Sequence, residues 1–372
     1  MKEEDLLYTM ALTMLSEIGA ITAKKLIAYI GSPEGVFRET KSSLERIPGI
    51  GQHLAGKITQ HNILHKAERE IISMSKERIS CIYYQEPEYP WKLKNCDDGP
   101  VLLFYRGQND FNRPKILSIV GTRDATQYGR ESCRSIIADL STKYPDLIIV
   151  SGLAYGIDIT AHRAALEYGL DTLAVLAHGL NTVYPSVHRE TAVKITKQGA
   201  LLSDFHSTIK PERNNFLRRN RIIAGLSDAT LVIESGKKGG SLITAEMASS
   251  YSREVFALPG RSEDPFSTGC NQLIKKNIAA LIESGDDIEF FLNWEVSQPA
   301  REAHVQLNIA LSEEERSILE IIRDTPIAGP EIISIRSGFQ LHTVVSLLLQ
   351  MELRNWISVL PGNRYKLSVK LP

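Results

Sequence analysis

The residues best suited to chemistry lie in three glycine-rich segments that each follow a short β-rich run. Gly121-Thr122-Arg123 follows SIV, residues 151–158 (SGLAYGID) follow LIIV, and residues 236–244 (GKKGGSLIT) follow LVIES. Glycine allows close approach of the backbone, and a following helix N-terminus directs free N–H groups at an anion. These segments therefore predict a phosphate-binding site. The Walker spacing and G-x-G-x-x-G are both absent, which argues against an NTP hydrolase and an ordinary dinucleotide enzyme.

A basic segment at residues 210–225 is the second chemical feature. It holds one acidic residue, Glu212, and five basic ones: Lys210, Arg213, Arg218, Arg219 and Arg221. Asn215 and Phe216 lie among the arginines, and this combination suits single-stranded nucleic acid, because arginine and asparagine bind phosphate and base edges while phenylalanine stacks on a base. A solvated helix face is the alternative explanation of such a charge run.

No set of residues completes a catalytic or metal site. Asp158 and His162 are four residues apart on a predicted helix, but no Ser or Cys nucleophile is placed beside them, so a capping or core role is favoured for Asp158. The nine histidines show no metal-ligand spacing, and the four cysteines form no C-x-x-C pair. The sequence therefore predicts no catalytic residue, no metal and no cofactor.

The bulk composition is that of an ordinary globular protein, with 43% hydrophobic residues and a net charge of -1. Attraction to nucleic acid must then come from local clusters of Lys and Arg. The first residues, MKEEDLLYTMALTML, contain no secretory cleavage site and are too short to span a bilayer. We expect a cytoplasmic protein without membrane association.

The elements that must position these residues form an α/β pattern. From Lys115 to about Leu292, short β-rich runs alternate with helical segments, which predicts parallel βαβ units in a Rossmann-like, doubly wound, mostly parallel sheet. Two strand-like runs within residues 79–106 extend this sheet, so the domain is assigned to residues 76–292. Ligands of such sheets lie outside the carboxyl ends of the strands, where the glycine-rich segments are expected.

Smaller domains are predicted on both sides. Residues 1–75 have helical spacing and a turn, Pro48-Gly49-Ile50-Gly51, typical of a helix-hairpin-helix or SAM-like domain, which serves either DNA contact or packing. Residues 293–310 are expected to be a linker. Residues 311–372 predict a winged-helix domain of three helices and a hairpin, with Ser312 and Glu315 as a capping box. Its apolar third helix favours partner or dimer contact over reading a DNA groove.

The central segment resembles the DNA-processing protein A (DprA, or Smf) family. The resemblance rests on motifs that occur in order: 120–123 (VGTR), 151–166 (SGLAYGIDITAHRAAL), 174–185 (AVLAHGLNTVYP), 215–227 (NFLRRNRIIAGLS), 239–248 (GGSLITAEMA), 253–260 (REVFALPG) and 269–274 (GCNQLI). It implies a non-enzymatic mediator that binds and protects incoming single-stranded DNA and helps to load RecA recombinase in natural transformation and recombination. It also implies a homodimer.

The resemblance implies site residues as well. Together with the residues singled out above, it predicts a DNA and phosphate site made of Gly121, Thr122, Arg123, Ser151, Gly152, Gly156, Asn215, Phe216, Asn220, Arg221, Gly240, Ser241 and Thr244. The family often has a DNA-binding lysine after the motif Tyr184-Pro185. This chain has no lysine there, and we expect Arg189 to replace it.

Two other classes of function are compatible with parts of the pattern. Gly239-Gly240 with Thr244 and Glu246 resembles the phosphate loop of nucleoside-phosphate glycoside hydrolases, but the full P-G-G-x-G-T-x-x-E spacing is missing. A Rossmann enzyme of that kind would release a base from nucleoside monophosphates. A pure assembly scaffold would self-associate without affinity for DNA.

Overall fold

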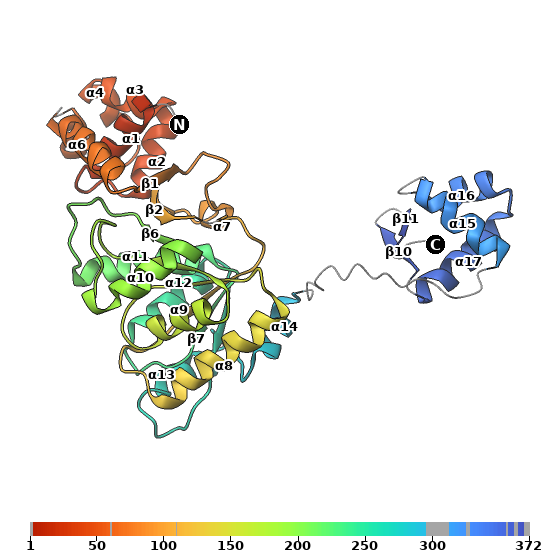
Figure 1. Ribbon diagram of the computed structural model, residues 1–372. Helices are drawn as coiled ribbons and strands as arrows, with labels where there is room; N and C mark the ends of the chain where they lie inside the picture. Colours follow the sequence, from red (N-terminus) through yellow and green to blue (C-terminus); the bar gives the residue numbers. More distant parts are fainter. Residues whose placement is uncertain are drawn as a thin grey trace. The chain divides into compact units, whose positions relative to one another are not determined.

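The computed structural model describes residues 3–59, 62–108, 110–294, 312–324, 328–354, 356–360 and 364–367. The chain forms two compact units, Met1–Val296 and Ser297–Pro372 (Figure 1). The first unit contains both the predicted helical domain and the predicted α/β domain. Residues 295–310 of the predicted linker lie outside the described residues.

A nine-stranded sheet in the order β1-β2-β6-β5-β4-β3-β7-β8-β9 forms the centre of the first unit. The strands from β3 to β9 pair in parallel, whereas β1 and β2 are antiparallel additions at one edge. The strands are β1 (Ser80–Tyr83), β2 (Leu102–Gly107), β3 (Ile116–Val120), β4 (Ile148–Ser151), β5 (Asp171–Val175), β6 (Gly199–Ser203), β7 (Ala229–Val232), β8 (Glu254–Ala257) and β9 (Ala280–Leu281). This arrangement confirms the predicted doubly wound, mostly parallel sheet, including its extension by residues 79–106.

Helices cover both faces of the sheet because its central strands are apolar on both sides. Leu117 and Ile119 of β3 pack in one cluster with α8 and α9, whereas Ile116 and Val120 of the same strand face α11 and α12. The helices of the α/β part are α7 (Trp91–Lys94), α8 (Gln127–Lys143), α9 (Ile157–Glu167), the 3-10 helix η1 (Ser186–His188), α10 (Arg189–Gln198), α11 (Arg213–Leu226), α12 (Gly240–Ser250), α13 (Thr268–Lys275) and α14 (Gly285–Leu292).

The N-terminal helices share a core with the sheet edge. They are α1 (Glu3–Met14), α2 (Ala20–Ile30), α3 (Pro33–Arg38), α4 (Lys41–Glu45), α5 (Gln52–Ile58) and α6 (Asn62–Lys76). Their buried side chains form one cluster with Val101 and Leu102 at the start of β2 and with Ile195 of α10. In addition, the buried carboxylate of Glu70 accepts hydrogen bonds from the backbone N–H and the hydroxyl of Ser207, at 2.6 and 2.5 Å. These contacts explain why the helices and the sheet form one compact unit.

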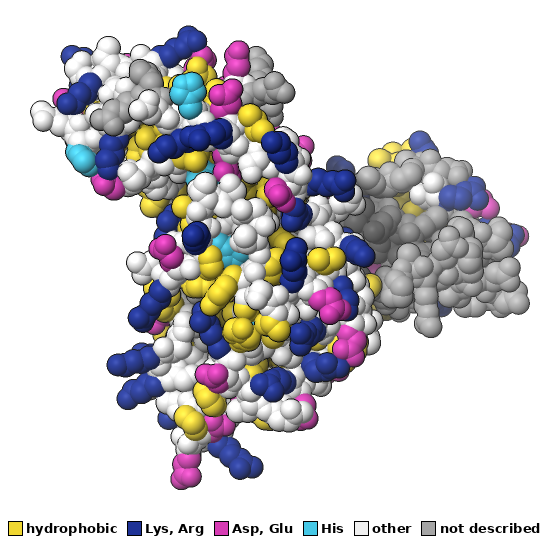
Figure 2. Space-filling view, turned by 60° about the vertical axis from the view of Figure 1, so that its left-hand side comes forward, with side chains coloured by type: hydrophobic (Ala, Val, Ile, Leu, Met, Phe, Trp, Pro, Cys, Tyr) yellow, Lys and Arg dark blue, Asp and Glu magenta, His cyan; other side chains and the backbone are white. Residues whose placement is uncertain are grey.

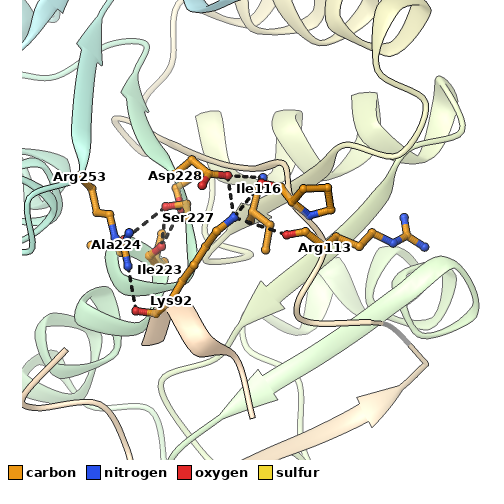
Figure 3. A network of polar contacts seen from close by, with 10 residues as sticks. Lys92, Arg113, Ile116, Ile223, Ala224, Ser227, Asp228 and Arg253 are labelled. Carbon is orange, nitrogen blue, oxygen red and sulfur yellow. Dashed lines mark hydrogen bonds and ion pairs between the residues drawn. The ribbon is translucent and has the colours of Figure 1, made fainter. Parts of the chain in front are cut away.

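An ion pair between Lys92 and Asp228 joins helix α7 to the sheet (Figure 3). Lys92 of α7 is only 2% exposed, and its Nζ lies 2.7 Å from Oδ2 of Asp228. The same carboxylate oxygen accepts the backbone N–H of Ile116 at 2.8 Å, and Arg253 donates to the carbonyl oxygen of Lys92 at 2.8 Å. Asp228 therefore connects α7 to the amino ends of β3 and β7.

The second unit has the elements of a winged helix. These are α15 (Glu313–Asp324), α16 (Pro330–Ser337), α17 (Leu341–Leu353) and the antiparallel strands β10 (Ile357–Leu360) and β11 (Arg364–Leu367). Ser312 and Glu315 form the predicted capping box, since each backbone N–H donates to the other residue's side chain, at 3.0 and 3.1 Å. No single helix in the described part of the chain is long and apolar enough to cross a membrane; α16 and α17 pass that test only as a pair bent by 115°.

Candidate nucleic-acid interface

A cleft of about 690 Å³ opens at the carboxyl ends of the parallel strands. The chain proceeds from β3 through β4 and β5 to β6 in one direction and then returns to β7 on the other side of β3. The cleft therefore lies at the switch point of a doubly wound sheet, where such folds bind their ligands. Its walls are the loops after β3 and β4, the first turn of α12 and one face of α11.

Eight of the predicted site residues line this cleft. They are Gly121, Thr122, Arg123, Phe216, Asn220, Gly240, Ser241 and Thr244. No side chain caps the first turn of α12, whose N-cap residue is Gly239. An uncapped helix N-terminus attracts an anion through its free N–H groups and the positive end of the helix dipole. The cleft thus combines a loop arginine with a helix end that favours phosphate.

The loop at residues 151–158 packs against the loop after β3 and against Arg219. A Cβ atom on Gly156, whose φ is +74°, would lie 2.1 Å from the carbonyl oxygen of Thr122. A Cβ atom on Gly152 would lie 2.1 Å from Nη1 of Arg219. Ser151 is buried, and its hydroxyl donates to the carbonyl oxygen of Ile119 at 2.6 Å. The two glycines and the serine therefore position the neighbouring loop and Arg219; they do not line the cleft.

Arg219 is a buried cation at the base of the cleft. It is 3% exposed, and its Nη1 donates to the carbonyl oxygens of Gly152, at 2.7 Å, and Val175. Burial lowers the pKa of Arg219 to about 10, Asp158 opposes this change, and Arg123 adds to it. At neutral pH Arg219 remains protonated and contributes a fixed positive charge.

Asp158, in the first turn of α9, bonds to the backbone of the loop after β4. Burial raises the pKa of Asp158, while Arg219 and the backbone N–H groups of Ala154 and Gly152 oppose the shift. Those N–H groups donate to its Oδ2 at 3.4 and 3.1 Å. His162 is oriented elsewhere, with Nδ1 2.7 Å from Oγ1 of Thr172, and burial lowers the pKa of His162 to about 3. Asp158, which also lines the cleft, therefore holds the loop after β4 at the start of α9, and His162 fixes α9 against β5.

Two guanidinium groups lie close to the ring of Phe216. The guanidinium carbons of Arg123 and Arg219 lie 5.2 and 5.9 Å from the centre of its ring, and the Tyr184 ring centre is 6.0 Å away. Tyr184 is 46% exposed. The cleft therefore offers aromatic surface next to positive charge. On one face of the molecule, Lys and Arg side chains surround a group of hydrophobic side chains (Figure 2).

Comparison with known proteins identifies the family. Residues 80–293 match DNA recombination-mediator protein A, and residues 302–363 match the DprA winged helix domain. The chain belongs to the DNA recombination-mediator protein A (DprA) family. Protein Smf of Escherichia coli K12 is 37% identical over 287 residues, which cover 75% of each chain.

Two solved structures of DprA proteins are similar to this chain. DNA processing protein A of Streptococcus pneumoniae is 31% identical, with a TM-score of 0.67, over 79% of this chain and 100% of that chain. The Helicobacter pylori protein, described for its single-stranded DNA binding mode, is 28% identical, with a TM-score of 0.52, over 58% of this chain and 94% of that chain.

Three more of the predicted site residues lie outside the cleft, in addition to Ser151, Gly152 and Gly156. Asn215 is buried, and its Nδ2 donates to the carbonyl oxygen of Lys210 at 3.1 Å. Arg221 pairs with Asp204 on another side of α11 and lines a separate small pocket. Arg189 is exposed but lines a second groove. The structure therefore does not bring these three side chains into the cleft that holds Arg123, and their contact with DNA stays a prediction.

Thirteen lining residues were not among the predicted site residues, and four of these have a side chain suited to binding a nucleotide. They are Tyr184, Arg213, Arg219 and Lys238. Arg213 and Arg219 belong to the basic segment, and helical spacing alone places Arg213, Phe216, Asn220 and Ile223 on one face of α11. That periodicity was the signal that separates the cleft-lining residues from Arg221.

Proposed function

We propose that this chain binds single-stranded DNA in the cleft between the loop after β3, the first turn of α12 and α11. The observation that carries the proposal is that the Phe216 ring and the exposed Arg123 line one cleft with an uncapped helix end, above the buried charge of Arg219. Guanidinium groups and helix N-termini bind phosphate, and an aromatic ring stacks on a base. One cleft thus offers partners for both parts of a nucleotide.

The arrangement favours a single strand over a duplex. In a duplex the bases are stacked on each other, so an aromatic side chain at the base of a cleft cannot reach a base face without unstacking. The Helicobacter pylori relative is described as binding single-stranded DNA. The contacts offered here are to phosphate and to the π-face of a base, and both are independent of sequence. We therefore expect little base preference.

The wider role is that of a non-enzymatic recombination mediator that protects the strand and helps to load a RecA recombinase, including during natural transformation. The family's description as a recombination mediator supports this role. A non-enzymatic role fits the bonding of Asp158 to backbone N–H groups, and Glu246, which the hydrolase alternative requires, is exposed and not among the residues that line the cleft.

A homodimer is part of the same proposal. Phe290 of α14 is 80% exposed, and Leu281, in the edge strand β9, is 45% exposed. Exposed aromatic and aliphatic side chains beside an open sheet edge suit a contact with a second copy. Sedimentation analysis of the chain and of Phe290→Ser tests this part, because the substitution should shift the chain toward the monomer.

Fluorescence anisotropy with a labelled oligothymidylate tests DNA binding. The logarithm of the affinity should fall with the logarithm of the salt concentration, with a slope of about -0.7 per neutralised phosphate. Arg123→Ala should weaken binding about 5-fold or more and reduce the slope by about 0.7. Lys194→Ala is the matched control, because Lys194 is exposed, pairs with Glu190 and does not line the cleft. Tighter binding of a duplex at equal salt would contradict the proposal.

A further inference from the structure

A second groove, of about 1030 Å³, lies along α10 on the other side of the loop that follows β5. One wall is the exposed face of α10, and the other is formed by the two residues that follow α6 and by the end of β2. The α10 residues that line it are Arg189, Ala192, Val193, Thr196 and Lys197. Their spacing of three and four residues places them on one helix face.

Positive charge is present on both walls of this groove. Arg189 and Lys197 lie at the two ends of the α10 face, and Arg78 lies on the opposite wall. All three are exposed, and within the residues that the structure describes their side chains make no hydrogen bond or ion pair. A fourth basic residue of the groove, Arg106, is already paired, because it donates to the Glu77 carboxylate at 3.0 Å. Three cations are thus available to a ligand.

The groove and the cleft lie on either side of a single loop. Tyr184 lines the cleft, while its neighbours Val183 and Ser186 line the groove. Val193, which is 51% exposed, adds apolar surface between the two cations of α10. A strand leaving the cleft over Tyr184 therefore meets Arg189 first and Lys197 next.

We propose that this groove binds the continuation of the single strand held in the cleft. The inference rests on the proposed function. At 1.5 Å per residue, the eight-residue separation of Arg189 and Lys197 along α10 corresponds to about 12 Å, so the two cations reach different phosphates of one strand. Arg78 and Lys197 contact phosphates from opposite walls, and Val193 packs against the strand between them. The groove therefore lengthens the DNA site beyond the cleft.

Oligonucleotide length separates the two sites experimentally. The test uses the whole chain, an oligothymidylate of about 6 nucleotides that fits the cleft, and one of about 16 nucleotides that extends past it. The groove variant is Arg78→Gln combined with Lys197→Gln. The control is Lys194→Gln, which removes one positive charge from α10 outside the groove.

The groove variant should bind the short oligonucleotide like the wild type. It should bind the long one about tenfold more weakly at about 0.15 M salt, with a salt slope less steep by about 1.4, because two phosphate contacts are lost. Lys194→Gln should match the wild type at both lengths. Wild-type affinity of the groove variant for the long strand would overturn the inference while the proposed function stood. Failure of the wild type to bind either length would overturn both.

Discussion

Replacing Arg219 by methionine should destabilise the first unit and, with it, the cleft. Methionine keeps much of the side-chain volume but removes the donor to the carbonyl oxygens of Gly152 and Val175. It also removes the cation that counteracts the rise in the pKa of Asp158 caused by burial. The buried aspartate would then lack a compensating charge in an environment from which water is excluded.

The expected loss follows from these contacts. Removing one of two neighbouring buried charges lowers the free energy of unfolding by about 3–5 kcal/mol, because the remaining charge, here that of Asp158, stays desolvated. At about 2–4 °C per kcal/mol for a unit of this size, the melting temperature should fall by about 6–20 °C. The adjacent Arg218→Met is the control, since Arg218 is exposed and its guanidinium carbon lies 5.0 Å from the Phe205 ring centre. Its loss should cost about 1 kcal/mol or less.

The pH dependence of this variant identifies the cause. Without Arg219 the pKa of buried Asp158 rises further, so its neutral form is favoured in the folded state. A group whose pKa is raised in the folded state contributes to the free energy of unfolding at acidic pH. This contribution is lost as the pH rises through the folded-state pKa. The deficit of Arg219→Met should therefore shrink from about pH 8 to about pH 5.

Urea unfolding followed by circular dichroism measures these effects. Adding Asp158→Asn to Arg219→Met should recover about 1–2 kcal/mol, because the uncompensated carboxylate is removed. The reasoning would be refuted by an Arg219→Met chain as stable as the wild type. It would also be refuted by a double variant no more stable than Arg219→Met at neutral pH.

Three further results are expected. Phe216→Leu should weaken binding of single-stranded DNA about tenfold in anisotropy titrations, because base stacking is lost, while Phe216→Tyr retains it; equal affinities of the two variants would contradict the stacking role. Asp228→Ala should lower the free energy of unfolding in urea by about 3 kcal/mol, because Lys92 stays buried without its partner, and Lys92→Met should recover part of this loss in the double variant. Gly156→Ala should lower both the melting temperature and the DNA affinity, since its Cβ would displace the loop at Thr122; an unchanged affinity would show that the loop tolerates the shift.

The sheet could be predicted from the sequence because its signal is local. Apolar runs alternating with helical segments determine a parallel doubly wound sheet, and the glycine-rich segments follow directly at its strand ends. The cleft residues Arg123, Ser241 and Thr244 were found in this way. Their position depends only on the loop or helix start to which they belong.

The assignment of α11 shows where sequence reasoning failed. Arg219 and Arg221 are two residues apart, so they project from different sides of the helix. Arg219 is buried below the cleft, and Arg221 pairs with Asp204. Which side faces the cleft depends on the packing of α11 against β3 and α12, which no local pattern records. The sequence also does not show that the loop after β5 lies between the cleft and the groove that Arg189 lines.

A crystal structure with a short oligothymidylate tests the central claim most directly. The proposal predicts a phosphate about 2.7–2.9 Å from a guanidinium nitrogen of Arg123, a second anionic contact at the first turn of α12, and a base against the Phe216 ring. A strand bound elsewhere on the chain, with the cleft between Arg123 and Gly240 vacant, would contradict it.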